Sequence, residues 1–340
     1  MSTGPNLEAL AAALGPRVRR NEALAHHTAI RIGGPADLLL VCESADEVAR
    51  AVKLARQHGV SWRLLGGGCN VLVSDSGARG LVIINRAVRI EFGLANAREE
   101  RESESSRSEG RANGTQFVNC TQFVNCTQSV AVWAEAGAPL AILARETVGR
   151  GLMGLAWAAG LPGTVGGAVV GNAGAFGGDV AGVLESATIL EPDGEIFERS
   201  NAWFRFGYRS SRLKGSDKPA VVLAATFALP PGDREALAAQ ADEYLTWRKT
   251  HHPSGATMGS TFKNPPGYHA GRLIEYAGLL GYRVGGAQVS EKHGNFFMNT
   301  GDATAADVLT LIERVQEVVR RRFGVTLEPE IELLGCWEGG

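Results

Sequence analysis

Residues 158–175 read Ala-Ala-Gly-Leu-Pro-Gly-Thr-Val-Gly-Gly-Ala-Val-Val-Gly-Asn-Ala-Gly-Ala, and this stretch decides the expected fold. Its glycines leave the main chain bare and free to adopt positive φ, and Pro162 fixes one turn. Successive amides in such turns form a concave site that suits a phosphate. Small residues follow, rather than the charged helix of a mononucleotide loop. The stretch therefore predicts a cradle for a large flat ligand with a diphosphate, although a single loop of this kind also occurs as an ordinary connection between strands.

A second glycine cluster, Gly66-Gly67-Gly68-Cys69-Asn70, strengthens the ligand interpretation. It follows an expected β-α-β unit, whose helix begins at the capping box Ser44–Glu47 and whose second strand ends at Leu65. In a Rossmann site the glycines open a helix, whereas residues 71–74 and 81–85 have the composition of strands. A Rossmann fold is therefore disfavoured. The sequence also contains no GxxxxGKS/T, HExxH or GxSxG motif, so NTPases, zincins and α/β-hydrolases lose their main support.

The composition excludes several classes of partner. The chain has 340 residues, enough for two domains, of which 44% are hydrophobic and 21% charged. Its formal net charge of −2 provides no broad basic field for nucleic acid or an acidic membrane. The 44 glycines favour a backbone that wraps a small ligand, and the five cysteines lack a disulfide-framework spacing. We therefore expect a monomer with reduced thiols and no metal, which binds neither nucleic acid nor membrane.

The N-terminus and the apolar segments predict a cytoplasmic protein. Residues 1–20 lack the basic start and the apolar core of a secretory signal. The longest apolar region, Leu152 to Val170, is interrupted by Pro162 and several glycines, which rules it out as a membrane-spanning helix.

Residues 93–128 differ from the rest of the chain. Arg98 to Arg111 is a mixed run of Arg, Glu and Ser without apolar periodicity, and the hexamer Thr-Gln-Phe-Val-Asn-Cys then occurs twice, at 115–120 and 121–126. A segment that buries little apolar surface does not fold alone, so we expect a disordered or surface insertion. Metal binding by the two cysteines is the alternative, but the repeat itself explains their spacing.

Hydrophobic periodicity and turn residues predict the remaining elements. Helices are expected over 7–19, 139–149, 235–249, 272–277 and 304–323, and strands over 27–36, 130–134 and 220–229. A hairpin is expected over 187–198 around Pro192-Asp193-Gly194, with a domain boundary at 230–233. Over 325–333 apolar residues alternate with Glu328, Glu330 and Glu332, which predicts a last strand with one buried face and one row of carboxylates.

Three further motifs follow the two glycine clusters in order: Gly-Tyr-Arg-Ser-Ser at 207–211, Gly-Ser-Thr-Phe-Lys-Asn-Pro at 259–265 and Leu-Glu-Pro-Glu-Ile at 327–331. Together these five motifs resemble the UDP-N-acetylenolpyruvoylglucosamine reductase (MurB) family. The resemblance runs from about residue 25 to 334 apart from the insertion. Because residues 204–260 hold no long loop with a lid tyrosine, the chain resembles the compact second type of this enzyme.

The resemblance implies an α+β fold with two functional parts. The FAD-binding domain would belong to the vanillyl-alcohol oxidase (PCMH-type) superfamily and comprise two α+β subdomains, 20–92 and 129–230. Residues 231–330 would form a smaller α+β substrate-binding domain, followed by a C-terminal tail over 331–340. The implied reaction is the NADPH-dependent reduction of UDP-N-acetylglucosamine enolpyruvate to UDP-N-acetylmuramate in peptidoglycan biosynthesis, with non-covalent FAD as cofactor and NADPH as co-substrate.

Three residues carry the implied chemistry. Hydride addition at C3 of the enolpyruvyl ether leaves negative charge at C2, which must be stabilised in place. Arg209 is a permanent cation suited to the substrate carboxylate. Glu330 fits beside it if the carboxyl group is paired or protonated. Ser260 would donate the proton to C2, because transfer from an alcohol to a carbanion-like enolate is downhill.

The remaining contacts come from the family positions alone. Cofactor contacts are implied for Ile32, Gly33, Gly34, Gly66, Gly67, Gly68, Cys69, Asn70, Val71, Pro162, Gly163, Thr164, Gly166, Gly167, Asn172, Ala173 and Gly174. Substrate contacts are implied for Tyr208, Lys263, Asn264, Gln288, His293 and Asn295, with a structural role as the alternative for His293.

The chain departs from the family pattern at two positions, and other interpretations stay open. Cys69 stands where the family has serine, and His252-Pro253 stands where it has Gln-Pro. Taken singly, Ser260 suits an ordinary turn, Arg209 a surface ion pair and Glu330 a solvated strand face, since periodicity does not distinguish it from its neighbouring glutamates. The rival functions are a small-alcohol oxidase or dehydrogenase on the same FAD fold, and a flavin-binding module without turnover.

Overall fold

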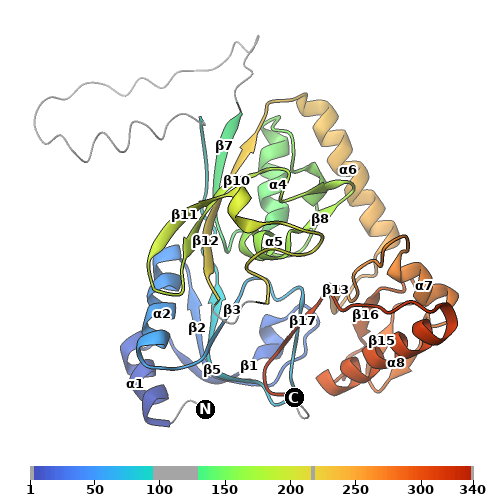
Figure 1. The fold of residues 1–340 in the computed structure, drawn as a ribbon, viewed down its shortest axis with the longest axis horizontal. Coiled ribbons are helices and arrows are strands. Elements are labelled where there is room, and N and C mark those ends of the chain that lie inside the picture. Colours follow the sequence, from blue (N-terminus) through green and yellow to red (C-terminus); the bar gives the residue numbers. More distant parts are fainter. Residues whose placement is uncertain (1–3, 95–128, 216–218, 338–340) are drawn as a thin grey trace, which may run out of the picture.

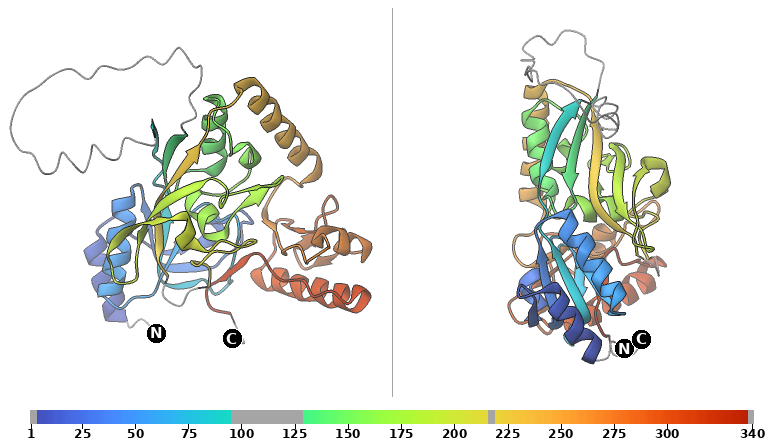
Figure 2. Two further views of the ribbon diagram at one scale, coloured as in Figure 1. Left: turned by 45° about the horizontal axis from the view of Figure 1, so that its top comes forward. Right: turned by 90° about the vertical axis from the view of Figure 1, so that its left-hand side faces the viewer.

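A computed structural model describes residues 4–94, 129–215 and 219–337. Two sheets with their helices form the N-terminal and central parts of the chain, and a third sheet with two helices forms the C-terminal part (Figure 1). Helix α6 (Arg234–His251) runs along the outside between the central and C-terminal parts, which two further views confirm (Figure 2).

The first sheet has the strand order β1 (Arg19–Ala23), β2 (Pro35–Cys42), β5 (Ala78–Asn85) and β3 (Trp62–Leu65). Strands β2 and β3 both run parallel to β5, and β1 is an antiparallel edge. Helices α1 (Gly4–Leu14) and α2 (Ala45–Gln57) accompany it. The Ser44 hydroxyl accepts the Glu47 amide at 3.2 Å, as the capping box predicts.

Two expectations for this region are wrong. The helix expected over 7–19 ends at Leu14, because Gly15 takes φ +89° and the chain then enters β1. The strand expected over 27–36 is a 3₁₀ turn (Leu24–His27) and a loop up to β2. Its alternating apolar residues Ile30 and Ile32 are buried, but they pack in the core of the C-terminal part rather than in this sheet.

The second sheet is antiparallel, with the order β11 (Ile196–Ser200), β10 (Leu184–Leu190), β12 (Val221–Leu229), β7 (Val130–Glu135) and β6 (Ile90–Leu94). Helices α4 (Leu140–Gly149) and α5 (Val165–Gly171) belong to this part, and α5 lies against β12 and β7. The predicted hairpin is confirmed by the β10–β11 pairing. The insertion was expected from residue 93, but Gly93 and Leu94 pair with β7; the rest of it, 95–128, lies outside the described residues.

The C-terminal sheet has the order β13 (Thr257–Ser260), β16 (Phe296–Asn299), β15 (Ala287–Val289) and β14 (Arg283–Val284). Helices α7 (Ala270–Tyr276) and α8 (Ala305–Phe323) pack with it. Helix α8 has the expected amphipathic stripe, a Thr304–Asp307 capping box and a left-handed Gly324 at its end. The predicted helices of this part are therefore confirmed within a few residues.

The end of the chain returns to the N-terminal part. Strand β17 (Glu332–Leu334) pairs in parallel with β4 (Val71–Val73), directly after the first glycine cluster. The expected strand over 325–333 is wrong, because only this short segment is regular and the Leu333 side chain is exposed. The Asp75 carboxylate also caps α8, accepting the amides of Ala305 at 2.8 Å and Ala306 at 3.0 Å. The junction between the N- and C-terminal parts is thus fixed by backbone pairing and by a cap.

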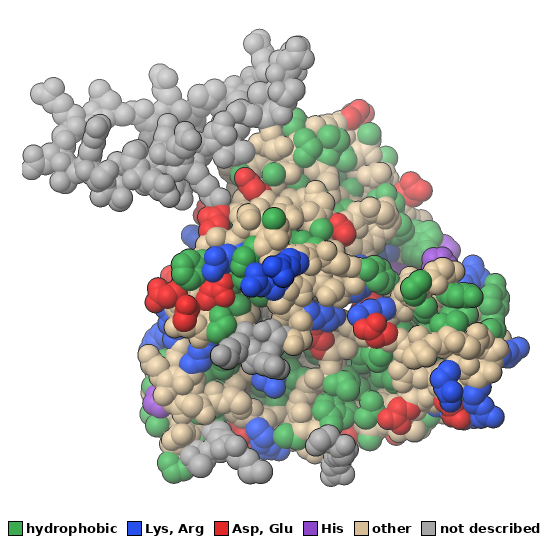
Figure 3. Space-filling model, in the orientation of Figure 1, with side chains coloured by type: hydrophobic (Ala, Val, Ile, Leu, Met, Phe, Trp, Pro, Cys, Tyr) green, Lys and Arg blue, Asp and Glu red, His purple; other side chains and the backbone are tan. Residues whose placement is uncertain are grey.

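The described residues include no helix with the length and apolarity needed to span a bilayer. On the face drawn in Figure 3, acidic and basic side chains are interspersed among hydrophobic ones, as the net charge of −2 leads one to expect.

Candidate active site

The two glycine clusters lie against each other, although almost a hundred residues separate them in the sequence. A Cβ atom added to Gly66 would lie 2.3 Å from Thr164 Oγ1, and one added to Gly67 would lie 3.4 Å from Gly163 Cα. Glycine at position 66 is therefore required by the close approach of the second cluster. The fold brings both predicted cradles into one place.

Backbone amides at this place have no acceptor. Within the described ranges, the N–H groups of Gly67, Gly68, Cys69 and Gly163 donate no hydrogen bond to the protein. Gly163 has φ +122° and nothing lies within 4 Å of the position that its Cβ would occupy. Unpaired amides on two bare, adjoining turns suit the oxygen atoms of a diphosphate. The residues present therefore fit a dinucleotide cofactor such as FAD.

Packing explains other residues of the predicted cofactor set. The Ile32 amide donates to Thr28 Oγ1 at 3.2 Å and its side chain is buried. A Cβ on Gly34 would lie 2.0 Å from the Asp75 carbonyl oxygen, and one on Gly166 would lie 2.8 Å from Ala136 Cβ. These residues are small or buried because chain segments meet there. Their contact with a cofactor stays a prediction.

Arg209 lies in a tight turn that directs it to a carboxylate. Gly207 and Ser210 exchange backbone hydrogen bonds of 3.0 and 3.2 Å, so Tyr208 and Arg209 are the two central residues. Arg209 Nε donates to Glu330 Oε1 at 3.0 Å, and Nη2 donates to the Gly174 carbonyl at 2.6 Å. The predicted partners Arg209 and Glu330 are thus joined, although 121 positions separate them.

The structure distinguishes Glu330 from its neighbours. Its side chain is 17% exposed, against 69% for Glu328 and 53% for Glu332. Burial raises the pKa of Glu330 above its ordinary value, while the positive charges of Arg209 and Lys214 oppose that shift. Glu330 is therefore the glutamate of this segment that is both desolvated and held by a guanidinium.

Ser260 ends β13 between the first glycine cluster and the Glu330 segment. Gly259 takes φ +77°, and its added Cβ would lie 3.8 Å from the Cys69 carbonyl oxygen. The next residue, Thr261, accepts the Glu330 amide through its carbonyl at 2.8 Å. The hydroxyl, guanidinium and carboxyl residues predicted for catalysis therefore come together beside the amide-lined turns.

Three predicted substrate residues lie close to this cluster. Tyr208 is 55% exposed, and its hydroxyl accepts the Asn264 amide at 3.2 Å. The Asn264 side chain in turn accepts the Ala270 amide at 2.9 Å. Lys263 forms an ion pair with Glu328. The exposed Tyr208 ring is therefore accessible to a ligand, whereas the Lys263 ammonium is held by Glu328.

The other predicted substrate residues are engaged in the protein. Asn295 is 4% exposed, and its amide group both donates to and accepts from the Phe262 backbone, at 2.8 and 2.9 Å. It braces the segment after Ser260, and its predicted contact with the substrate stays a prediction. His293 Nδ1 accepts the Asn295 amide at 3.1 Å, which supports the structural alternative. Gln288 contacts Gly281 and Arg283 on the same sheet.

Sequence reasoning missed Lys214. Its ammonium lies 3.5 Å from the carbonyl oxygens of both Arg209 and Glu330. It follows the Gly-Tyr-Arg-Ser-Ser motif by three residues, and that spacing is the signal that could have suggested it. Asn70, predicted for the cofactor, also donates to the Glu330 carbonyl at 3.2 Å.

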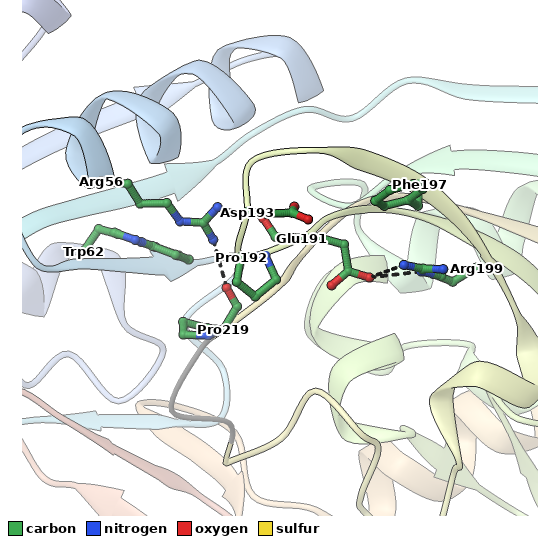
Figure 4. A pocket seen from close by; sticks show the side chains of 8 residues that line it. All are labelled: Arg56, Trp62, Glu191, Pro192, Asp193, Phe197, Arg199 and Pro219. Atoms are coloured by element: carbon green, nitrogen blue, oxygen red, sulfur yellow. Dashed lines mark hydrogen bonds and ion pairs between the residues drawn. The ribbon is translucent and has the colours of Figure 1, made fainter.

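A separate hollow of about 700 Å³ lies between the first two sheets (Figure 4). It is lined by Arg56, Trp62, Glu191, Pro192, Asp193, Phe197, Arg199 and Pro219. Arg199 is paired with Glu191, and Arg56 donates to the Glu191 and Pro219 carbonyls. Its cations are thus satisfied within the protein, and none of the site residues above contributes to it.

Comparison with known proteins gives the family. Residues 250–334 match the model of the UDP-N-acetylenolpyruvoylglucosamine reductase C-terminal domain, and residues 36–93 and 106–200 match an FAD binding domain. The UDP-N-acetylenolpyruvoylglucosamine reductase of Rubrobacter xylanophilus is 44% identical, over 95% of this chain and 97% of its own. The chain belongs to the UDP-N-acetylenolpyruvoylglucosamine reductase family.

Other members of the UDP-N-acetylenolpyruvoylglucosamine reductase family agree with this assignment. The enzyme numbered 2 of Symbiobacterium thermophilum is 43% identical, over 94% of this chain and 92% of its own. The crystal structure of MurB from Thermus caldophilus superposes with a TM-score of 0.71 at 33% identity, covering 94% of this chain and 99% of that one. The predicted α+β FAD-binding fold and the predicted family are confirmed.

Proposed function

We propose that this chain reduces UDP-N-acetylglucosamine enolpyruvate to UDP-N-acetylmuramate, with NADPH as the reductant and FAD as the cofactor. The observation that carries the proposal is the Arg209–Glu330 pair beside Ser260, next to two turns with unpaired amides. In the balanced reaction one hydride from NADPH and one proton add across the enolpyruvyl double bond, giving NADP⁺ and the lactyl ether. FAD, when bound, relays the hydride from NADPH to C3 of the substrate.

Arg209 stabilises the charge that develops during hydride addition. The carboxylate attached to C2 delocalises the electrons, and a fixed cation beside it lowers the energy of that state. The guanidinium is already oriented by Glu330 and by the Gly174 carbonyl, so little reorganisation is needed when the substrate arrives. A planar guanidinium also offers a second edge for a carboxylate.

Glu330 orients that cation. Its hydrogen bond to Arg209 Nε, together with the Nη2 bond to the Gly174 carbonyl, leaves the N–H groups of Nη1 and one N–H of Nη2 for the substrate. Burial raises the pKa of this carboxyl group, and its ion pair with Arg209 balances its charge, which limits its repulsion of the substrate carboxylate.

Ser260 supplies the proton to C2. Its position at the end of β13 is fixed by the Thr261 contact with the Glu330 backbone and by the Asn295 brace on Phe262. A serine hydroxyl is a weak acid in water, but the acceptor is an enolate and transfer to it is favourable. Solvent then restores the hydroxyl proton.

The two domains divide the binding tasks in this proposal. Residues 20–92 and 129–230 hold the cofactor, with the amides of the two glycine clusters on its diphosphate. Residues 231–330 bind the UDP-sugar, with Lys263 near its phosphates and Tyr208 and Asn264 at the mouth of the site. We place the reaction in the cytoplasm as a step of cell wall biogenesis that supports cell shape and division, carried out by a monomer.

NADPH oxidation followed with and without UDP-N-acetylglucosamine enolpyruvate tests the proposal. Purified protein should be yellow, and absorbance at the NADPH band should fall at a sustained rate only when the substrate is present. A protein that binds no FAD, or that oxidises small alcohols and ignores the enolpyruvyl substrate, would contradict it. A flavin-binding module without turnover would bleach once with NADPH and then stop in the presence of substrate.

A further inference from the structure

Asn172 has a position that a cofactor contact does not explain. It is 4% exposed, and its carboxamide group is engaged with three residues in two other segments of the protein. Nδ2 donates to the Gly207 carbonyl at 2.9 Å and lies 3.3 Å from Asp179 Oδ2, and Oδ1 accepts the Ala181 amide at 3.0 Å. The Gly207 carbonyl belongs to the turn that carries Arg209.

That turn needs external support. Arg209 has φ +52°, a left-handed conformation that is unfavourable for a residue with a side chain and persists only where the surroundings enforce it. Only two reciprocal backbone hydrogen bonds, between Gly207 and Ser210, close the turn itself. Without further contacts, Arg209 would relax toward commoner backbone angles, and its guanidinium would leave Glu330.

Lys214 and Asn264 contact the middle of the turn, and the other support comes from one short segment, 170–174, within the glycine-rich cradle. The Val170 carbonyl accepts the Ser211 hydroxyl at 2.6 Å, at the end of the turn. The Asn172 amide holds the start of the turn through Gly207. The Gly174 carbonyl accepts Arg209 Nη2 at 2.6 Å. The segment therefore fixes both ends of the turn and its catalytic side chain.

Two demands select asparagine at position 172. The residue is the C-cap of α5 and takes φ +44°, a left-handed conformation that glycine and asparagine tolerate best. Glycine would tolerate the backbone conformation but has no side-chain amide group, and the aspartate side chain has no N–H to donate to the Gly207 carbonyl. Asparagine combines the backbone conformation with one donor and one acceptor.

We propose that Asn172 is a positioning residue for Arg209: its amide holds the 207–211 turn so that the guanidinium faces Glu330 and the substrate carboxylate. The inference rests on the proposed function in one respect, the contact of Arg209 with that carboxylate. It assigns Asn172 to the turn and not to the cofactor.

The test compares two ligands that differ in that carboxylate. UDP-N-acetylmuramate carries a lactyl carboxylate and UDP-N-acetylglucosamine carries none, so the ratio of their dissociation constants, measured by calorimetry on the FAD-loaded protein, reports the Arg209 contact. In Asn172→Gly, which keeps the backbone preference, the preference for the carboxylate ligand should fall about tenfold, the effect of one hydrogen bond. Asn172→Asp should lose at least as much.

Three companion measurements separate the possible roles. Asn201→Gly is the matched control, since Asn201 also donates two hydrogen bonds to backbone carbonyls, at 2.8 Å each, but to Ala181 and Leu184 outside the turn. That control should leave the ligand ratio unchanged. The flavin-to-protein ratio of Asn172→Gly should equal that of the unmodified protein. In an Arg209→Ala background, Asn172→Gly should change the ratio less than twofold, because the two residues act as a unit.

Several results would overturn the proposal. They are an unchanged ligand ratio in Asn172→Gly, an equal weakening of both ligands, a loss of flavin, or an additive effect in the Arg209→Ala background. If Arg209→Ala alone keeps the full preference for the carboxylate ligand, the assignment of Arg209 in the proposed function fails and the inference fails with it. The behaviour of that single variant distinguishes the two failures.

Discussion

Substitution of Gly66 by alanine tests the contact between the two glycine clusters. The added Cβ would lie 2.3 Å from Thr164 Oγ1, 3.0 Å from its Cγ2 and 3.2 Å from its Cβ. A change of the Thr164 rotamer would remove only part of the overlap, because Cβ is fixed to the backbone. It would also move the hydroxyl that caps α5 at Gly167. The two turns must therefore separate.

The expected magnitude follows from the overlap. Overpacking by one methyl group typically costs about 1–3 kcal/mol. If this free energy is subtracted from the binding free energy of FAD, the dissociation constant for FAD rises about 5- to 150-fold. Flavin fluorescence quenching on the apoprotein measures this constant directly, without any turnover.

Gly171→Ala is the matched control. It lies in the same cradle, at the end of α5, and nothing is found within 4 Å of its added Cβ. Its FAD affinity should stay within about twofold, and helix propensity should stabilise it slightly, by up to about 1 kcal/mol. Thr164→Ala added to Gly66→Ala should recover part of the affinity. Equal FAD affinity in Gly66→Ala and Gly171→Ala would refute the contact between the clusters as the reason for glycine at position 66.

Three further predictions concern catalysis and pH. In Ser260→Ala the flavin should still be bleached by NADPH, but the enolpyruvyl substrate should be reduced about 10²- to 10⁴-fold more slowly. Stopped-flow absorbance measures the two half-reactions separately. Normal turnover of this variant would show that Ser260 is not the proton donor. The pKa of Glu330 is raised in the folded protein, so the folded state binds its proton more tightly than the unfolded chain does. The contribution of this group to the free energy of unfolding therefore falls as pH rises above its ordinary pKa of 4.5. Glu330→Gln should therefore gain melting temperature relative to the unmodified protein between pH 4.5 and 7, and a pH-independent difference would contradict the assignment. Burial lowers the pKa of His252 from 6.5 to about 4, so the unfolded chain takes up a proton that the folded protein does not, and stability is lost as pH falls through that window. His252→Gln should therefore reduce this pH dependence in urea titrations at pH 4.5 and 7, and an unchanged pH dependence would contradict the assignment.

Local patterns predicted the elements whose stabilising contacts are periodic. Helix α8 has its stripe, its capping box and its terminal glycine in the sequence itself. Strand β1 was missed because its residues, Arg-Arg-Asn-Glu-Ala, show no apolar alternation; it is a polar edge that β2 alone holds. The segment with Ile30 and Ile32 looks like a strand because it alternates, yet its burial comes from the C-terminal core.

In the candidate site, too, local sequence patterns do not reveal which residues are buried or paired by tertiary contacts. Periodicity puts Glu328, Glu330 and Glu332 on one face, but only tertiary contacts bury Glu330 and expose the others. The Arg209 partner and the Asn295 brace depend on segments far apart in the sequence. The family resemblance named Glu330 and Arg209 correctly as neighbours. It also placed Asn295 among the substrate contacts, whereas the structure shows its structural role in bracing Phe262.

The position of Glu330 depends on the return of β17 to β4 in the N-terminal part of the chain. Arg209 lies in the connection between β11 and β12 of the second sheet, Ser260 ends a strand of the third, and the first glycine cluster lies between β3 and β4. The site therefore exists only where these parts meet. The return of β17 to β4 puts Glu330 next to Asn70, whose side chain and carbonyl bind the Glu330 carbonyl and the Glu332 amide. The Asp75 cap on α8 secures the same junction from the other side. A change that loosens the junction should therefore separate hydroxyl, guanidinium and carboxyl groups together, and should abolish substrate reduction while the cradle of the two glycine clusters still binds FAD.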